Sequence, residues 1–231
     1  MIYIVIPYKE RKNQLTNYLK SVISLFKECL SEFRIIIVEQ CNTKPLNKGL
    51  LINAAIMHLN LQSDDDLIFH SVDIVPKRSV VLECYNAEIP PKAVIGICSN
   101  DTGIAGVIKM KKSTFESVNG YPTNYWGWGF EGETLKERLN LAGVESIVKY
   151  TPNTRLCEEN FNISNDSTSI ARNERLEGQR NETLHKLFRD ADREKKIYTM
   201  GRSGLSTTHY KVIRHLFMDR EPRVELITVD I

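Results

Sequence analysis

The chain has 231 residues, of which 42% are hydrophobic and 26% charged, so it can bury one sizeable core and is expected to form a single domain. Its 31 basic and 29 acidic residues give a formal net charge of +2 and are spread along the sequence, which argues against a nucleic-acid or membrane partner. Strand-like residues begin at Ile2 and no apolar run approaches membrane-spanning length, so we expect no signal peptide, no transmembrane segment and a cytoplasmic location.

The N-terminal part alternates between apolar strands and amphipathic helices. Residues 1–7 form a β-branched run, and residues 15–30 carry apolar side chains at helical spacing. The pattern recurs with a strand at 33–38, a helix at 46–61 and a third strand at 66–70. Strands without polar alternation, separated by helices, predict a largely parallel sheet covered on both faces.

After Pro76 the pattern is looser. The stretch 158–196 is highly polar and is expected to be a loop or an exposed helical excursion. The other elements expected here are strands at 94–98 and 106–110, a short helix at 113–118, a helix at 131–142 ending at Gly143, a strand at 144–149, and a terminal hairpin from 207–217 and 223–231.

One candidate site follows the third strand, in the sequence Ser71-Val72-Asp73. Ligands of open parallel sheets bind beyond the carboxyl ends of the strands, where Asp73 is expected to lie. A carboxylate there suits Mg²⁺ or Mn²⁺, which would bridge the protein to a diphosphate. The alternative is that Asp73 caps a turn before Pro76.

A second candidate site follows the first strand. Tyr8 is placed to face a nucleobase, and Lys9 or Arg11 to face a phosphate. The alternative is a solvated loop that opens the next helix, because basic residues are common near the ends of elements.

The third and most informative segment is 119–133. It contains both tryptophans, Trp126 and Trp128, beside four glycines and the acids Glu131 and Glu133. Tryptophan rings stack on sugars, glycines let the backbone move, and carboxylates bind or deprotonate hydroxyls, so the segment predicts a lid over a sugar site. The alternative is an aromatic plug of the core, with the two acids favourable only because they lie in a first helical turn.

These motifs follow one another as they do in the β-1,4-galactosyltransferase family, which the sequence resembles. The stretches that carry the resemblance are Ile6–Arg11, Leu46–Asn53, Ser71–Pro76, Trp126–Glu133 and the tail from Ser203 to Ile231. The resemblance implies an α/β GT-A fold with a mainly parallel central sheet and a small C-terminal β-hairpin. It also implies one catalytic domain over 1–231, with a nucleotide-binding half (1–76) and an acceptor-side half (94–231).

The activity implied by the resemblance is that of an inverting hexosyltransferase. It would move galactose or a related sugar from a UDP-sugar to a hydroxyl of a glycan or glycoconjugate, with Mn²⁺ or Mg²⁺ held by Asp73. The implied donor-binding residues are Pro7, Tyr8, Arg11, Lys48, Val72, Asp73 and Trp128. The implied acceptor-binding residues are Tyr125, Trp128, Gly129 and Glu131.

Departures from the family pattern concern the metal and the catalytic base. The family's Asp-Val-Asp is Ser71-Val72-Asp73 here, and the histidine that the family supplies to the metal is missing, so Glu158, Glu159 and His185 are candidate substitutes. Gly132 occupies the position of the usual catalytic Asp and cannot accept a proton. Three alternatives follow: Glu131 or Glu133 is the catalytic base, its pKa raised by the surrounding aromatic residues; the acceptor docks differently; or the chain is a non-catalytic nucleotide-sugar or glycan-binding module.

Overall fold

The protein is described by a computed structural model over residues 1–90, 92–98, 106–127, 129–148, 161–163, 180–186, 203–218 and 221–231. Most of its strands form one large sheet, and two short strands, β4 (Ile74–Pro76) and β8 (Phe161–Ile163), pair separately. In spatial order the large sheet contains β7 (Glu145–Val148), β5 (Ala93–Cys98), β6 (Val107–Lys111), β3 (Asp66–Phe69), β1 (Ile2–Tyr8), β2 (Phe33–Gln40), β10 (Glu221–Asp230) and β9 (Lys211–Met218).

The centre of the sheet is parallel and its flanks are mixed. β1 runs parallel to β2 and β3, and β10 runs parallel to β2. β6 is antiparallel to both β3 and β5, and β9 is antiparallel to β10. The predicted parallel core is confirmed, and the C-terminal strand pair is present as part of the main sheet.

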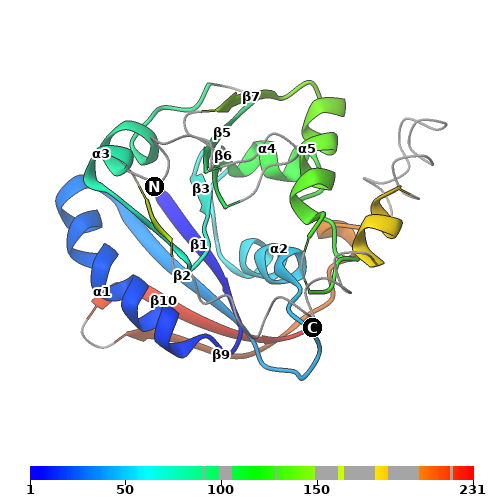
Figure 1. The fold of residues 1–231 in the computed structure, drawn as a ribbon, viewed down its shortest axis with the longest axis horizontal. Helices are drawn as coiled ribbons and strands as arrows, with labels where there is room; N and C mark the ends of the chain where they lie inside the picture. The colour runs from blue at the N-terminus through cyan, green and yellow to red at the C-terminus, as the bar shows by residue number, and fades with distance from the viewer. Residues whose placement is uncertain are drawn as a thin grey trace.

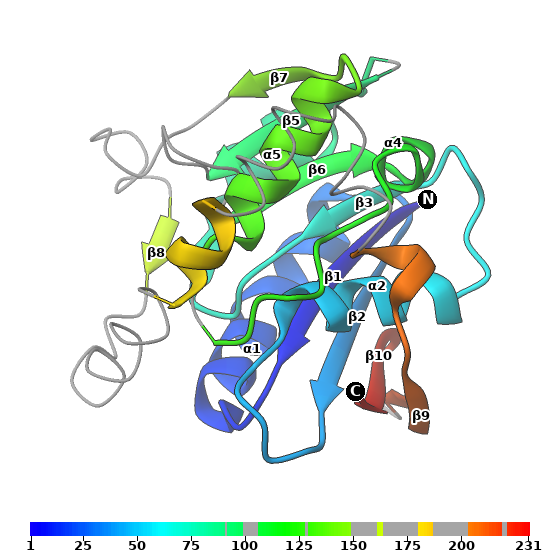
Figure 2. The same cartoon turned by 90° about the vertical axis from the view of Figure 1, so that its right-hand side faces the viewer.

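Helices cover both faces of the sheet (Figures 1 and 2). Helix α1 packs on one face, whereas α2, α4 and α5 lie on the other (Figure 2). The helices are α1 (Lys12–Cys29), α2 (Lys48–His58), α3 (Arg78–Val80) with the π-helix η1 (Val81–Tyr85), α4 (Lys112–Ser117), α5 (Glu131–Leu141), the 3₁₀-helix η2 (Leu205–Thr207) and a short helix at 180–186.

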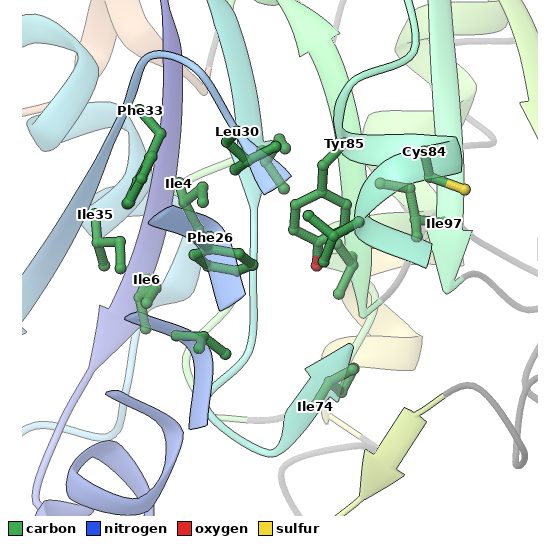
Figure 3. Close-up of a cluster of buried hydrophobic side chains, with 14 of the residues drawn as sticks. Ile4, Ile6, Phe26, Leu30, Phe33, Ile35, Ile74, Cys84, Tyr85 and Ile97 are labelled. Atoms are coloured by element: carbon green, nitrogen blue, oxygen red, sulfur yellow. The ribbon is translucent and has the colours of Figure 1, made fainter. Parts of the chain in front are cut away.

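Alternation along the strands divides the core into two layers. Ile4 and Ile6 point toward α1 and pack with Phe26, whereas Val5 packs toward α2. Figure 3 shows the first layer, in which Phe26 lies between the strand residues and Tyr85 of η1. Because both faces are buried, the central strands contain almost uninterrupted apolar residues.

The segment after Pro76 is more ordered than the sequence predicts. It continues into α3 and η1, whose Val81, Cys84 and Tyr85 are buried in the α1 layer. Lys109 Nζ donates to Tyr85 O at 2.6 Å and to Ala87 O at 2.7 Å, which holds carbonyl groups at the end of the π-helix. This lysine is on β6, far along the chain, so the local sequence pattern gives no sign of the contact.

Among the described residues, no helix is long and apolar enough to cross a membrane.

Candidate functional site

The carboxyl ends of β1, β2 and β3 bring the predicted site residues to one edge of the sheet. Tyr8 at the end of β1 is paired with Glu39 of β2, and Val5 is paired with Phe69 at the end of β3. Parallel strands end on the same side, so the loops after them are neighbours. This edge, which includes Arg11, Lys48 and Asp73, is called the carboxyl edge below.

Two of the predicted residues form an ion pair at this edge. Arg11 Nη1 donates to Asp73 Oδ2 at 2.5 Å, with 36% of the Arg11 side chain and 28% of the Asp73 side chain exposed. Ser71 Oγ donates to the same carboxylate oxygen at 3.2 Å, and Asp73 N donates to Ser71 Oγ at 3.3 Å. The loop after β3 is therefore tied to the loop after β1.

The remaining residues of the first motif are mostly inside the protein. Tyr8 is buried, and this burial, followed by the charge of Glu39, raises the pKa of its hydroxyl. Lys9 Nζ donates to the carbonyls of Asn42 and Lys44 at 2.6 and 2.9 Å, so it fastens the loop after β2. Pro7 is partly buried at the end of β1.

His70 supports the loop that carries Asp73. Its Nδ1 lies 2.8 Å from Ser71 O, which can only accept, so Nδ1 carries the proton and Nε2 accepts from the Tyr85 hydroxyl at 2.6 Å. Burial, partly opposed by the bond to Ser71, lowers the pKa of His70 to about 4, which keeps the ring neutral near pH 7. Val72 is also buried, so any contact with a donor would involve its main chain.

Lys48 joins the carboxyl edge to the segment that contains the tryptophans. It begins α2 and lies 3.2 Å from Glu131 Oε1 at the start of α5, with both side chains largely buried. Burial lowers the pKa of Lys48, but the Glu131 carboxylate and Tyr121 outweigh it, and the net pKa is raised. Lys48 is therefore charged and paired at neutral pH.

The start of α2 also contacts the main chain of the tryptophan segment, residues 119–133. Asn47 Oδ1 accepts from Leu50 N at 2.9 Å and caps the helix, while its Nδ2 donates to Thr123 O at 2.8 Å. A Cβ on Gly49 would lie 2.1 Å from Pro122 O, so only glycine permits this approach. The close contact explains a glycine near the start of a helix.

Further bonds hold the tryptophan segment on both sides of Trp126. Asn53 Nδ2 donates to Tyr121 O at 2.9 Å and its Oδ1 accepts from Tyr121 N at 3.0 Å. Lys44 Nζ lies 5.1 Å from the centre of the Trp126 ring, and Trp126 O accepts from Asn181 Nδ2 at 3.1 Å.

Gly129 has φ +99° and open space where a side chain would be, as expected of a loop that needs glycine. Trp128 lies outside the described residues.

Helix α5 directs its two N-terminal acids to different places. Side chains two positions apart on a helix point about 200° apart, so Glu131 and Glu133 leave α5 in different directions. Glu133 lines a pocket of about 430 Å³ between α5 and the short helix at 180–186. These two helices lie side by side in Figure 2. Burial, together with the charge of Glu131, raises the pKa of Glu133, against main-chain hydrogen bonds and the charge of Lys48.

The pocket has an aromatic wall supported by a chain of hydrogen bonds. The rings of Phe130 and His185 stack with centroids 5.2 Å apart, and Phe130 has the unusual φ of +72°. Tyr125 Oη lies 2.8 Å from Thr134 Oγ1, which lies 3.1 Å from His185 Nδ1, and Glu137 flanks the imidazole at 3.5 Å. Tyr125, predicted to bind acceptor, is 3% exposed and belongs to this support. His185, a candidate metal ligand, lies at the pocket.

The chemistry of Asp73 fits a divalent cation as one protein ligand. Mg²⁺ is usually held by one or two carboxylates together with substrate phosphates, and Asp73 with the Ser71 hydroxyl offers oxygen donors at the carboxyl edge. Within the described ranges no three His, Cys, Asp or Glu residues are grouped as a metal centre. The candidate ligands Glu158 and Glu159 lie outside those ranges.

The fold and the charged carboxyl edge define the chain as an α/β protein of GT-A fold, and solved structures agree. The catalytic domain of Drosophila β-1,4-galactosyltransferase 7 in complex with xylobiose superposes with a TM-score of 0.75 at 16% identity, covering 100% of this chain and 93% of that chain. A mutant of that protein in complex with manganese, UDP-Gal and xylobiose gives 0.74 over the same shares. A mannosyltransferase from Pyrobaculum calidifontis with GDP-Man and Mn²⁺ gives 0.52 at 12% identity, covering 67% of this chain and 58% of that one.

Sequence comparisons identify the family within this fold. Residues 1–85 match the family model described as the N-terminal region of glycosyl transferase group 7, and residues 98–168 match the N-terminal domain of galactosyltransferase. β-1,4-galactosyltransferase 4 of Cricetulus griseus is 26% identical over 242 residues, and that of Homo sapiens is 26% identical over 238. This chain is a distant member of the β-1,4-galactosyltransferase family. The matches cover 99% of this chain and 63% of each relative.

Sequence reasoning missed the residues that hold the site together. The partners of Asn53, Gly49 and His70 are all distant in the chain, at Tyr121, Pro122 and Tyr85. Only Asn47 carried a recognisable local signal, because Asn directly before an apolar helical run is a typical N-cap.

Proposed function

We propose that this chain is an inverting, metal-dependent hexosyltransferase that moves galactose or a related sugar from a UDP-sugar to a hydroxyl of a glycan or glycoconjugate. Membership of the β-1,4-galactosyltransferase family supports the reaction class. Related folds in complex with manganese, UDP-Gal and xylobiose support the choice of metal, donor and acceptor class. The observation that carries the proposal is the Lys48–Glu131 contact, which joins the carboxyl edge to the acids of α5.

The carboxyl edge would bind the donor diphosphate. Arg11 and Lys48 supply the positive charges, and Asp73 would hold Mn²⁺ or Mg²⁺. A divalent ion bound there neutralises negative charge on the leaving diphosphate. His70 orients the Asp73 loop through Ser71, and Lys48 is held in place by Glu131.

Glu133 is the catalytic base in this proposal. Glu131 is engaged by Lys48, whereas Glu133 faces the pocket and has a pKa raised by burial, which brings it closer to the working pH of a base. The acceptor hydroxyl would lose its proton to Glu133 while its oxygen forms a bond to the anomeric carbon. The bond from that carbon to the diphosphate oxygen would break on the opposite side, which inverts the configuration.

The test is a comparison of three glutamine variants on UDP-Gal, UDP-GalNAc and UDP-Glc, with donor hydrolysis and transfer to xylobiose both measured. Glu133→Gln should lower kcat by a factor of about 10² to 10⁴, as expected for loss of a general base. Glu131→Gln should act mainly on KM for the donor, because it frees Lys48. Glu116→Gln, in an ion pair on α4 and not part of the pocket lining, is the matched control and should have little effect.

Two results would contradict parts of this proposal. A Glu133→Gln variant as active as the wild type would exclude Glu133 as the base. Tight UDP binding without turnover of any donor would instead favour a nucleotide-sugar or glycan-binding module, which is the alternative suggested by Gly132 in α5.

A further inference from the structure

The two cations of the carboxyl edge that would meet the donor are already paired with carboxylates. Arg11 Nη1 lies 2.5 Å from Asp73 Oδ2, and Lys48 Nζ lies 3.2 Å from Glu131 Oε1. The Ser71 hydroxyl donates to the same Oδ2 atom. The oxygen of Asp73 that would meet a metal therefore already accepts two hydrogen bonds.

The position of Arg11 allows its side chain to change partners. Its main-chain carbonyl accepts from Leu15 N at 3.0 Å, so its backbone is fixed by the first turn of α1. Its side chain is 36% exposed, and the partner Asp73 is 28% exposed. A guanidinium in this setting can swing on its flexible stem without displacing the helix.

A divalent cation and the Arg11 guanidinium would compete for Asp73. Both are attracted to the same carboxylate oxygen, and they repel each other at close range. A diphosphate offers the guanidinium a better partner, because phosphate oxygens accept its parallel N–H groups in a bidentate arrangement. Arrival of the nucleotide would therefore free Asp73 at the moment when the metal is needed.

We propose that Arg11 exchanges between Asp73 and the donor diphosphate, so that it holds the metal position closed until the nucleotide binds. The exchange rests on the proposed function, because it assumes a diphosphate and a divalent ion at this edge. It makes metal and nucleotide bind cooperatively: each improves the affinity for the other by the same factor. Metal alone binds weakly.

The test measures Mn²⁺ binding by electron paramagnetic resonance and UDP binding by calorimetry, with no turnover required. Arg11→Gln should bind Mn²⁺ several-fold to about tenfold more tightly in the absence of UDP, because a competing positive charge near the ion is removed. The same variant should bind UDP about tenfold more weakly at saturating Mn²⁺, because a charge-assisted contact to phosphate is lost. The two affinities therefore change in opposite directions.

Three further variants make the result specific. Arg78→Gln removes an arginine from an exposed ion pair with Glu28 and should change neither affinity. Arg11→Lys keeps the positive charge beside Asp73 and should bind Mn²⁺ in the absence of UDP as weakly as the wild type, although it loses the bidentate contact to phosphate. Asp73→Asn should abolish the Mn²⁺ binding of the Arg11→Gln protein.

The outcomes separate the exchange from the proposed function. If Arg11→Gln leaves the affinity for Mn²⁺ unchanged or weakens it, the exchange is overturned even if UDP still binds. Mn²⁺ binding that survives Asp73→Asn also overturns it, since the ion then lies elsewhere. Failure of the wild type to bind UDP with or without Mn²⁺ would refute the proposed function, and the exchange with it.

Discussion

Replacing Gly49 by alanine should destabilise the protein, although alanine is the better helix former. Within a helix this exchange by itself favours folding by about 1 kcal/mol. The structure reverses the sign, because a Cβ on Gly49 would lie 2.1 Å from Pro122 O and 3.3 Å from Tyr121 Cβ. Both atoms belong to the tryptophan segment, and the nearer one is main chain, which cannot rotate away.

The magnitude follows from what must move. The backbone near Pro122 would have to retreat by roughly an ångström, which is an overpacking cost of about 1–3 kcal/mol. The same movement would stretch the bonds from Asn47 to Thr123 O and from Asn53 to Tyr121, each worth about 1 kcal/mol. After the helix-propensity gain, we expect a net loss of about 2–4 kcal/mol.

Urea denaturation followed by circular dichroism measures this loss as a change in the free energy of unfolding. Met57→Ala is the matched control, because Met57 is on α2 and 47% exposed, and the two residues have similar helix propensity. It should change stability by less than about 0.5 kcal/mol. A Gly49→Ala protein that is as stable as the wild type, or more so, would refute the close approach of α2 to the tryptophan segment.

Three other predictions concern buried polar groups. Asn53→Ala should cost about 2–4 kcal/mol in urea denaturation, because both main-chain groups of Tyr121 lose their buried partner; a loss below 1 kcal/mol would show that water replaces the amide. His70→Phe should lower the free energy of unfolding by about 2–3 kcal/mol and also weaken Mn²⁺ binding. Tyr85→Phe should lower it by about 1 kcal/mol, because this variant keeps the bond from His70 to Ser71. Equal losses of stability in the two variants would contradict this order. Burial raises the pKa of Glu133 above 4.5, so its ionisation is less favourable in the folded state. The wild type should therefore lose stability relative to Glu133→Gln as the pH rises from below 4.5 through the raised pKa, and a pH-independent difference between the two unfolding free energies would contradict the burial of this carboxyl.

The sequence was sufficient to predict the parallel core and the edge at which ligands would bind. The strands at 1–7, 33–38 and 66–70 are rich in apolar residues, which predicts that they are buried. Because these strands are parallel, the polar residues directly after them lie at one edge of the sheet. The family resemblance assigned both Arg11 and Asp73 to the donor site. It could not predict that they form an ion pair, because the distance depends on loop conformations.

What the sequence could not predict are contacts between segments distant in the chain. Lys109 of β6 donates to the carbonyl at the end of the π-helix η1, and the stretch 78–85 gives no periodic signal of its own. The lysine is buried with Asp66 at 2.8 Å, and burial lowers its pKa despite that partner. Lysine is ordinarily predicted to be exposed, so the sequence did not indicate that Lys109 is buried and contacts η1.

The choice between Glu131 and Glu133 shows how structure sharpens a question that the sequence left open. Helical geometry alone says that the two acids point in different directions, but not which direction faces the nucleotide. The contact with Lys48 fixes Glu131 toward the carboxyl edge, and the pocket beside Phe130 and His185 then belongs to Glu133. Glu131, which would lie nearer the donor in the proposed site, is thereby paired with a cation. In the proposed reaction the carboxylate with the raised pKa, Glu133, would accept the proton, so α5 offers a candidate base even though Gly132 has no acid.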